Sequence, residues 1–515
     1  MTRKNQPNLV YIFTDQQRVD TMSAYGNDWI KTPNLNRLSE DSIVFENAYV
    51  SAPICTPSRS TQMTGLWPHT NGCTKNNIPL ADDIKTFAEF FPNDYHTAYY
   101  GKWHLGDEVK KRRGWDEWHS LEDQYRVWST KEENNEILSD YHHYLISQGY
   151  KPEKESSGKM VFSRSFAAQL PEEHTKASYL GRKVSEFIDH NKENPFAICV
   201  NFFEPHPPYT GPFDDLYEPD DIPQTPVFRV DPPGDASRMA TLMAEEQAKK
   251  EFFILDHAPE IKNEDYGTSI PKTDDELGGP QTISEKEFRK IQANYYGLVT
   301  LMDKAVGQIL DAIEKAGISE ETIVVFTSEH GDQMGDHNIF QKIVMYEQSA
   351  KVPMLLRVPW LESYRVKGRY SHIDTIPTLL ELMGHKVPDH LQGQSRMEDV
   401  EAKKSLEEND VYLDWNGRSV DQTFPLSELE RMREIPHRCV ITGDGWKLNL
   451  SVGDQSELYD LNDDPYEQVN LYDNVKFSGK VVELAHKIRK WQLETGDTAL
   501  IPEVYPGVGF VEGMR

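Results

Sequence analysis

The chain contains several short, continuous apolar runs, and each is followed by ionisable or metal-ligating side chains. These runs cover residues 9–14, 195–203 and 322–327, and residues 96–101 form a further short strand-like segment. Runs of this length without polar alternation are typical of strands buried on both faces of a parallel sheet. A long helical pattern at 284–316 precedes the last of them, and strands that alternate with helices indicate an α/β fold. We therefore predict a large, doubly wound, mostly parallel sheet flanked by helices.

The strand–helix rhythm ends near residue 380, which predicts a domain boundary. A polar stretch rich in Glu and Lys follows at about 398–410, and later strand-like pieces lead to a helix at about 479–495. We assign residues 1–400 to a main domain and residues 401–515 to a smaller C-terminal α+β subdomain. Two irregular segments interrupt the main domain at about 107–176 and 210–283. We interpret them as insertions, which commonly serve as lids or binding loops.

The composition narrows the classes of partner. The chain has 515 residues and a formal net charge of −29, so we expect neither nucleic acid nor an anionic membrane surface as a partner. An anionic substrate would have to meet a local cluster of cations, because the overall field repels it. No apolar stretch reaches the length of a membrane span, and the first apolar run is too short for a signal peptide. We therefore expect a cytoplasmic protein, unless a secretory signal has been removed.

Hard metal ligands follow two of the predicted strands. Asp15 and Gln16 come directly after the first strand, and Glu329 and His330 follow the last one. Ligand sites of open α/β sheets lie off the carboxyl ends of the strands, and carboxylate and amide oxygens suit Ca²⁺ or Mg²⁺. An acidic residue after a strand is more often a helix cap, so each pair alone is weak evidence. Together with Cys55 they predict a cage for one divalent cation.

Cys55 opens the pentapeptide Cys-Thr-Pro-Ser-Arg, which ends at Arg59. We interpret Thr-Pro-Ser as a turn and expect a helix to start at Ser60 and to stop at Gly65. The helix dipole stabilises an anion near the N-terminal end of a helix. The alternative is a buried structural thiol. The four cysteines lie far apart and give neither a zinc-site spacing nor a disulfide framework.

Basic side chains follow the other two strands. Lys102 and His104 lie on the same side of an extended segment, because side chains alternate there. His206 lies in a proline-rich turn, and Lys342 comes after the predicted metal ligands. A single basic residue in a loop is normally solvated. The joint occurrence of these residues indicates an anion-binding site.

The order of these motifs resembles that of the type I sulfatases, the formylglycine-dependent members of the alkaline-phosphatase-like superfamily. The resemblance spans roughly residues 8–400 and continues more weakly beyond them. The matching motifs are Phe13-Thr14-Asp15-Gln16, Cys55-Thr56-Pro57-Ser58-Arg59, Gly101-Lys102-Trp103-His104-Leu105-Gly106, His206-Pro207-Pro208-Tyr209, Thr327-Ser328-Glu329-His330-Gly331-Asp332, Lys342 with Tyr346-Glu347, and Asp374-Thr375-Ile376-Pro377-Thr378.

The resemblance implies a modified residue and a metal site. A separate formylglycine-generating enzyme would oxidise Cys55 during maturation. The ligands of one divalent cation, most simply Ca²⁺, would be Asp15, Gln16, the modified Cys55, Glu329 and His330. The family usually has Asp at the position of Glu329, and the longer arm alters the metal geometry. Asn is common at the position of His330, and a histidine ligand leaves room for Mg²⁺ or Mn²⁺.

The resemblance also implies catalytic roles. The catalytic group would comprise Cys55, Arg59, Lys102, His104, His206 and Lys342. Arg59 and Lys102 would hold the formylglycine hydrate, and His206 and Lys342 would bind the sulfate. The hydrate would attack sulfur in line, with Glu329 as the base and His206 as the acid for the leaving alcohol. His104 would then deprotonate the second hydroxyl, which expels sulfate and restores the aldehyde.

Three functions remain open at this point. The first is hydrolysis of a sulfate monoester, either a small aryl sulfate or a sulfated mono- or oligosaccharide. The second is hydrolysis of a phosphonate or phosphate diester with the same nucleophile, because tetrahedral anions of similar size fit one cage. The third is a non-catalytic binding protein in which Cys55 stays a thiol. The aromatic-rich segment 107–176 favours a carbohydrate substrate, because aromatic rings can stack on sugars.

Overall fold

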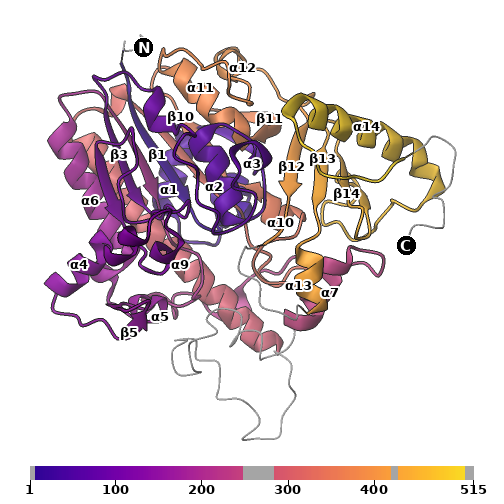
Figure 1. Cartoon of the computed structure of the whole chain (residues 1–515), viewed down its shortest axis with the longest axis horizontal. Coiled ribbons are helices and arrows are strands. Elements are labelled where there is room, and N and C mark those ends of the chain that lie inside the picture. The colour runs from indigo at the N-terminus through magenta and orange to yellow at the C-terminus, as the bar shows by residue number, and fades with distance from the viewer. Residues whose placement is uncertain (1–5, 248–283, 419–426, 505–515) are drawn as a thin grey trace, which may run out of the picture.

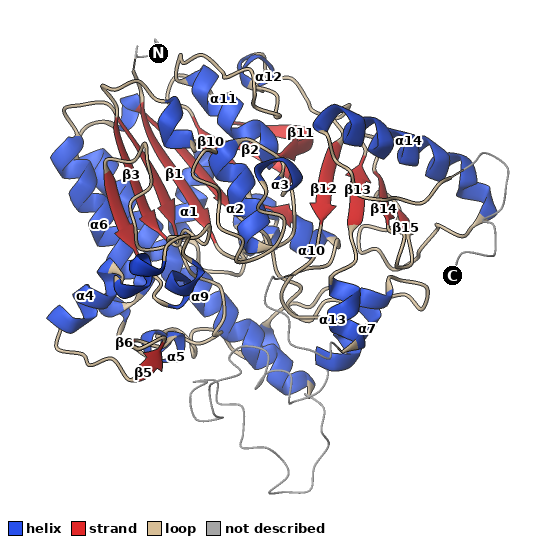
Figure 2. Ribbon diagram, in the orientation of Figure 1, coloured by secondary structure: helices blue, strands red, loops and turns tan. Residues whose placement is uncertain are grey.

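The computed structural model describes residues 6–247, 284–418 and 427–504. A large mixed sheet with helices on both faces forms the main body (Figure 1). A four-stranded antiparallel sheet stands beside it and carries one long helix (Figure 2). The predicted segment 210–283 lies outside the described residues from 248 onward.

The main sheet has nine strands in the order β11-β2-β10-β8-β1-β7-β3-β4, and β9 pairs with β2. Strands β8, β1, β7, β3 and β4 pair in parallel, with β4 at the edge, whereas β10 is antiparallel to both of its neighbours. This arrangement confirms the predicted α/β class with a mostly parallel sheet. The strands are β1 (Asn8–Thr14), β2 (Ile43–Tyr49), β3 (His96–Gly101), β4 (Glu117–Ser120), β7 (Phe196–Asn201), β8 (Thr322–Ser328), β9 (Lys351–Val352), β10 (Met354–Arg357) and β11 (Tyr364–Ser371).

The alternation of side chains along the strands gives the sheet two separate cores. On β1, Val10 and Ile12 belong to one buried cluster, whereas Tyr11 and Phe13 belong to another. The first cluster includes residues of α1 (Pro33–Glu40), α6 (Lys176–Asn191) and α9 (Glu285–Lys315). The second includes residues of α2 (Cys55–Thr64) and α11 (Thr375–Leu382). Burial on both faces explains why the central strands read as continuous apolar runs.

The register brings the carboxyl ends of four strands to one level. Thr14, the last residue of β1, pairs with Ser328 at the end of β8. Asn201, the last residue of β7, pairs with Phe13 on one side and with Gly101 of β3 on the other. The polar residues that follow these strands therefore emerge at the same edge of the sheet.

The segment 107–176 is in part an extension of the sheet, and its interpretation as a pure insertion is wrong there. Strand β4 pairs in parallel with β3 at the sheet edge. Trp118 stacks on Tyr99, and Trp115 meets the same ring edge-on, so these aromatics pack the core. The remainder forms short elements, namely α4 (Asp140–Ser147), β5 (Lys154–Ser156), β6 (Lys159–Val161) and α5 (Arg164–Ala168).

The C-terminal sheet is fastened to the main body by a buried charge cluster. It contains β12 (Val411–Trp415), β13 (His437–Ile441), β14 (Trp446–Leu450) and β15 (Glu457–Asp460), and α14 (Ser478–Thr495) packs against it. Lys447 of β14 is fully buried and pairs with Glu467 at 2.8 Å and with Glu347 at 3.0 Å. Glu347 begins α10 (Glu347–Ala350) of the main body. Short helices complete the described fold: α3 (Pro68–Asn71), α7 (Arg238–Gln247), α12 (Met397–Glu401) and α13 (Glu428–Arg433).

Among the described residues, none of the helices combines the length and the hydropathy that crossing a membrane requires.

Replacement of Gly101 tests the close contact between β3 and β7. Gly101 has a φ of +125°, and a Cβ there would lie 2.0 Å from the Asn201 carbonyl oxygen. We expect Gly101→Ala to lower the free energy of unfolding by about 3 kcal/mol. Gly149→Ala is the matched control, because its φ is +90° but a Cβ there meets nothing within 4 Å. The control should lose about 1 kcal/mol. Urea unfolding followed by tryptophan fluorescence measures both, and equal losses would contradict the steric explanation.

Candidate active site

Helix α2 starts at Cys55 itself, so the predicted start at Ser60 is wrong. Pro57 falls in the first turn, where a missing N–H removes no intrahelical hydrogen bond. The helix ends at Gly65 in a left-handed conformation, as predicted. Every residue of α2 is buried, and Cys55 is 1% exposed. The Cys55 side chain thus lies in the N-terminal turn, where the helix dipole favours negative charge.

Cys55 lies in a compact cluster with three predicted metal ligands. Ligand atoms of Asp15, Cys55, Glu329 and His330 all lie within 4.8 Å of one another. His330 Nε2 is 3.3 Å from Cys55 Sγ and 3.1 Å from Glu329 Oε1. His330 Nδ1 donates to the carbonyl oxygen of Gly331 at 2.9 Å, so Nε2 is the ring nitrogen that faces Cys55 and Glu329. The backbone therefore orients the imidazole for metal binding.

Two buried cations neutralise the carboxylates of this cluster. Arg59 pairs with Glu329 through Nε, and its Nη2 lies 3.7 Å from Asp15. Lys102 pairs with Asp15, and its carbonyl oxygen accepts a hydrogen bond from Arg59 at 2.7 Å. Burial raises the pKa of Glu329, but the charges of Arg59 and Lys102 outweigh it and hold that pKa well below its usual range. A carboxylate that stays ionised suits a metal ligand better than a general base.

Gln16 is held in one orientation by its neighbours. Its Nε2 donates to the hydroxyl of Tyr209 at 2.8 Å and to the carboxylate of Asp332. Its Oε1 accepts from Lys342 Nζ. Gln16 also has a φ of 74°, an uncommon value for a residue with a side chain. The chain therefore fixes the Gln16 amide with its oxygen on the Lys342 side.

The residues of the cluster fit a divalent cation. Asp15 Oδ1 is buried without a hydrogen-bond partner in the described part of the chain, whereas the carboxylate of Glu329 faces Arg59 and His330. Buried acceptors of this kind are costly unless something satisfies them. Carboxylate oxygens, an amide oxygen nearby and one imidazole nitrogen form a donor set that suits Ca²⁺, Mg²⁺ or Mn²⁺.

His104 lies beside this cluster with one ring nitrogen unused. Its Nε2 lies 2.9 Å from Asn77 Oδ1, to which it donates as a neutral ring, and its buried Nδ1 makes no hydrogen bond within the described residues. Burial and the charge of Lys102 hold the pKa of His104 well below its usual range. The ring also stacks on Tyr125 at a centroid distance of 3.7 Å. His104 therefore presents a fixed imidazole with an available lone pair.

His206 lines a cavity that leads to Cys55. The cavity has a volume of about 170 Å³, and Lys342 also lines it. His206 Nδ1 donates to the carbonyl oxygen of Pro207 at 2.8 Å, so Nε2 is an acceptor while the ring is neutral. Burial and the charges of Lys342 and Lys102 hold the pKa of His206 well below its usual range. A bound anion would oppose these effects and favour a proton on Nε2.

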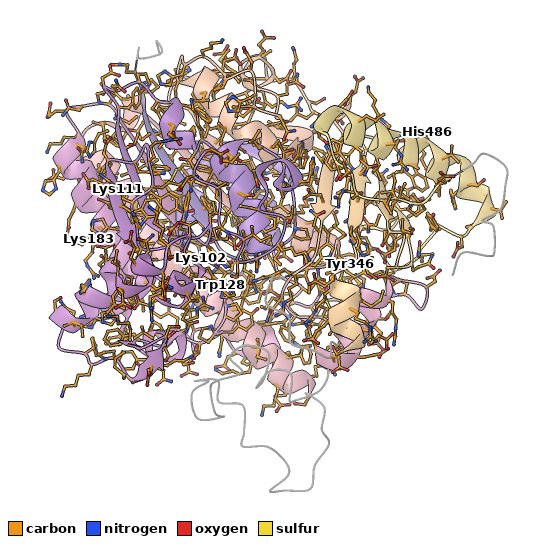
Figure 3. All side chains as sticks on the ribbon, viewed as in Figure 1. Lys102, Lys111, Trp128, Lys183, Tyr346 and His486 are labelled. Carbon is orange, nitrogen blue, oxygen red and sulfur yellow. The ribbon has the colours of Figure 1, made fainter. Side chains whose placement is uncertain are left out.

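The wall of the cavity combines polar and apolar side chains. Beyond Cys55, His206 and Lys342, its described lining residues are Ile54, Asn76, Gln124, Tyr125, Arg164, Ser165, Pro207, Pro208, Met243, Gln247, Gln341, Ile343, Arg418 and Arg433. Several predicted site residues thus lie on or next to one cavity. Figure 3 shows Lys102 inside the main body near the carboxyl end of β3, whereas Lys183 and His486 lie on outer helices.

Comparisons with known proteins identify the family of the chain. The profile of the sulfatase family matches residues 7–385. The chain belongs to the sulfatase family. A second profile, described as the C-terminal part of N-sulphoglucosamine sulphohydrolase, matches residues 335–494 of this sulfatase.

Relatives of this sulfatase align over nearly the whole chain. An ulvan-active sulfatase from Formosa agariphila is 27% identical over 96% of this chain and 82% of its own length. A structure described as a complex with its substrate D-glucosamine-2-N,6-O-disulfate has a TM-score of 0.72 at 23% identity, covering 96% of this chain and 99% of the other. A phosphonate monoester hydrolase of Agrobacterium radiobacter has a TM-score of 0.70 at 22% identity, covering 95% and 96%. These two structures show the shared fold.

Sequence reasoning missed Glu108, which supports the loop that carries Lys102 and His104. Its carboxylate accepts the backbone N–H groups of Trp103 at 2.9 Å and His104 at 2.6 Å. Burial raises the pKa of Glu108 to about 7, although these two hydrogen bonds act in the opposite direction. No motif marks this residue, because its role depends on how the chain turns back after Gly106.

Glu108 makes the stability of this sulfatase depend on pH. Between about pH 4.5 and 7 the folded protein keeps a proton on Glu108 that the unfolded chain has released. The free energy of unfolding therefore falls as pH rises through this interval. The wild type should lose about 3 kcal/mol of it relative to Glu108→Gln. Urea unfolding at several pH values measures the difference. Glu401→Gln, at an exposed position of α12, serves as the control. A constant difference between wild type and Glu108→Gln would contradict the expectation.

Proposed function

We propose that this protein hydrolyses sulfate monoesters of carbohydrates, with Cys55 converted to formylglycine and one divalent cation bound beside it. The observation that carries the proposal is the position of Cys55 at the start of α2, in one cluster with Asp15, Glu329 and His330. Membership of the sulfatase family supports the same chemistry. It also argues against the non-catalytic alternative.

The proposed cation and formylglycine would supply a Lewis acid and a nucleophile that the unmodified side chains lack. The cation, held by Asp15, Gln16, Glu329 and His330, would neutralise charge on the sulfuryl oxygens and lower the pKa of a bound hydroxyl. Formylglycine would supply two hydroxyls on one carbon, so that sulfate can leave without attack of water on sulfur.

The remaining residues stabilise charge and move protons. Arg59 and Lys102 are fixed cations next to Cys55, and preorganised charges of this type stabilise the transition state in a site that excludes water. We assign His104 as the base for the second hydroxyl, since its buried Nδ1 is unused. His206 would donate to the leaving oxygen after the substrate anion has raised its pKa. Glu329 serves better as a metal ligand than as the base that the family resemblance suggested, because its pKa is held low.

The cavity wall supports a sugar as the group that leaves. Asn76, Gln124, Gln247 and Gln341 line it and can donate to and accept from hydroxyl groups. Tyr125 is the aromatic residue among the described lining, and His104 already stacks on its ring. The support for a carbohydrate therefore comes from amides rather than from free aromatic faces.

A phosphonate or phosphate diester is the second candidate substrate class. The structural similarity to a phosphonate monoester hydrolase motivates it. We expect the purified protein to hydrolyse sulfated monosaccharides and 4-nitrophenyl sulfate with a higher kcat/KM than bis(4-nitrophenyl) phosphate or a phenyl phosphonate ester. Rates on this panel decide between the classes. A higher kcat/KM for the phosphorus esters would transfer the proposal to the second class.

Replacement of Cys55 tests the nucleophile. We expect Cys55→Ser and Cys55→Ala to reduce kcat by at least about 10³-fold, because neither side chain can become the hydrate. Cys439→Ala is the matched control, since Cys439 is also a fully buried thiol but lies on β13, outside the site. Its kcat should stay within a few-fold of that of the wild type.

Mass spectrometry of the peptide around Cys55 completes this test. The protein should be produced together with a formylglycine-generating enzyme, and the active fraction should then carry the aldehyde. Full activity in a sample that contains only the thiol, or in Cys55→Ala, would refute the proposed nucleophile.

A further inference from the structure

We propose that the natural substrate carries a second anionic group beside the scissile sulfate ester, and that Arg164 binds this group in the outer part of the active-site cavity. This inference rests on the proposed function and names the substrate class of the same site. The second group would be a sulfate, a sulfamate or a carboxylate on the sugar.

The charge of the cavity wall is the first argument. Among the described residues that line it, the charged side chains are Lys342, Arg164, Arg418 and Arg433, and no carboxylate is present. The whole chain has a formal net charge of −29, so this cationic lining is local. Another cavity, of about 560 Å³, contains Arg18 and Lys351 together with Asp20 and Glu347 and shows no such bias. A negatively charged ligand therefore fits the active-site cavity and not the 560 Å³ cavity.

The position of Arg164 is the second argument. The cations next to Cys55 are Arg59 and Lys102, which already pair with the carboxylates of the metal cluster. Arg164 and Lys102 both contact the ring of Tyr125: Arg164 Cζ is 4.7 Å from the ring centre, and Lys102 Nζ is 5.0 Å from it. Arg164 is therefore near the reacting group without belonging to the metal cluster. A second anion on the same sugar could reach it.

The hydrogen bonds of Arg164 leave capacity for a ligand. Its Nε donates to Glu122 at 3.0 Å, but Glu122 also pairs with Lys176, so one carboxylate serves two cations. The Nη2 atom of Arg164 is buried and has no hydrogen-bond acceptor within the described residues. A buried guanidinium with an unused N–H gains most from an anionic acceptor. Two oxygens of a tetrahedral sulfate, or the two oxygens of a planar carboxylate, can accept from the forked N–H groups of a guanidinium.

The C-terminal part of the chain contributes to the same wall. Arg418 follows β12, and Arg433 is the last residue of α13. In Figure 1, α13 lies beside α7, which supplies Met243 and Gln247 to the cavity. The outer wall therefore combines α5, α7 and the C-terminal subdomain, and its charge does not depend on one element.

A pair of non-hydrolysable ligands tests the inference. Isothermal titration calorimetry would compare benzenesulfonate with benzene-1,3-disulfonate on the full-length protein. We expect the disulfonate to bind at least about tenfold more tightly, because one more charge-assisted hydrogen bond forms. In Arg164→Gln this preference should fall to about twofold or less. Arg164→Lys, which keeps the charge but loses the fork, should retain an intermediate preference.

Arg182→Gln is the matched control, because it removes the same charge from helix α6 outside the cavity. It should keep the full preference for the disulfonate. Equal affinities of the two ligands for the wild type, or an unchanged preference in both Arg164 variants, would overturn the inference. Hydrolysis of 4-nitrophenyl sulfate, measured on the same samples, separates the two proposals. If the protein hydrolyses sulfate esters but does not prefer the disulfonate, only the second-anion subsite is rejected. If it prefers the disulfonate but hydrolyses no sulfate ester, the proposed function is rejected.

Discussion

The buried ion network around Arg59 is the interaction on which the site depends. Arg59 lies on α2 and has no exposed surface, and it contacts Glu329 after β8, Asp15 after β1 and the Lys102 carbonyl after β3. One guanidinium thus joins a helix to the ends of three strands. Removing one partner of a buried ion pair typically costs about 3–5 kcal/mol, because the remaining charge is left uncompensated. The buried cations Arg59 and Lys102 therefore hold the carboxyl edge of the sheet together.

The fold and the chemistry share one geometric cause. Parallel strands in register end at one level, so the residues that follow them gather in one place. The strand ends supply Asp15, Glu329 and His330 of the cluster together with Lys102, and α2 supplies Cys55 and Arg59. The cavity wall also includes residues of α5, α7 and the C-terminal subdomain. The sheet thus positions the clustered ionisable side chains, and the peripheral elements line the cavity beside them.

Much of the central fold was predictable because burial on both faces leaves a strong pattern. Strands β1, β3 and β8 begin and end within one residue of the predicted runs. Strand β4 was not foreseen, because it is four residues long and lies at the sheet edge, where a half-exposed strand has no continuous apolar run. The start of α2 was misplaced because Pro57 reads as a turn residue, although a proline is tolerated in a first helical turn.

The site was predictable to the extent that its residues directly follow strands or belong to family motifs. Arg164 and Glu108 could not be found in this way. Arg164 lies beside the ring of Tyr125, which is distant in sequence, and Glu108 accepts from backbone N–H groups that carry no sequence signal. The aromatic residues of segment 107–176 suggested stacking on a sugar, but Trp115 and Trp118 pack in the core and do not line the cavity.

The complete burial of α2 limits when another protein can reach Cys55 during synthesis and folding. Cys55 and every other residue of this helix are enclosed by the finished structure. Once the protein has folded, a modifying enzyme could not bind the segment around this thiol in an extended conformation, because the segment is helical and buried. An enzyme that modified Cys55 would therefore have to act before this helix is enclosed, so such a modification would compete in time with folding.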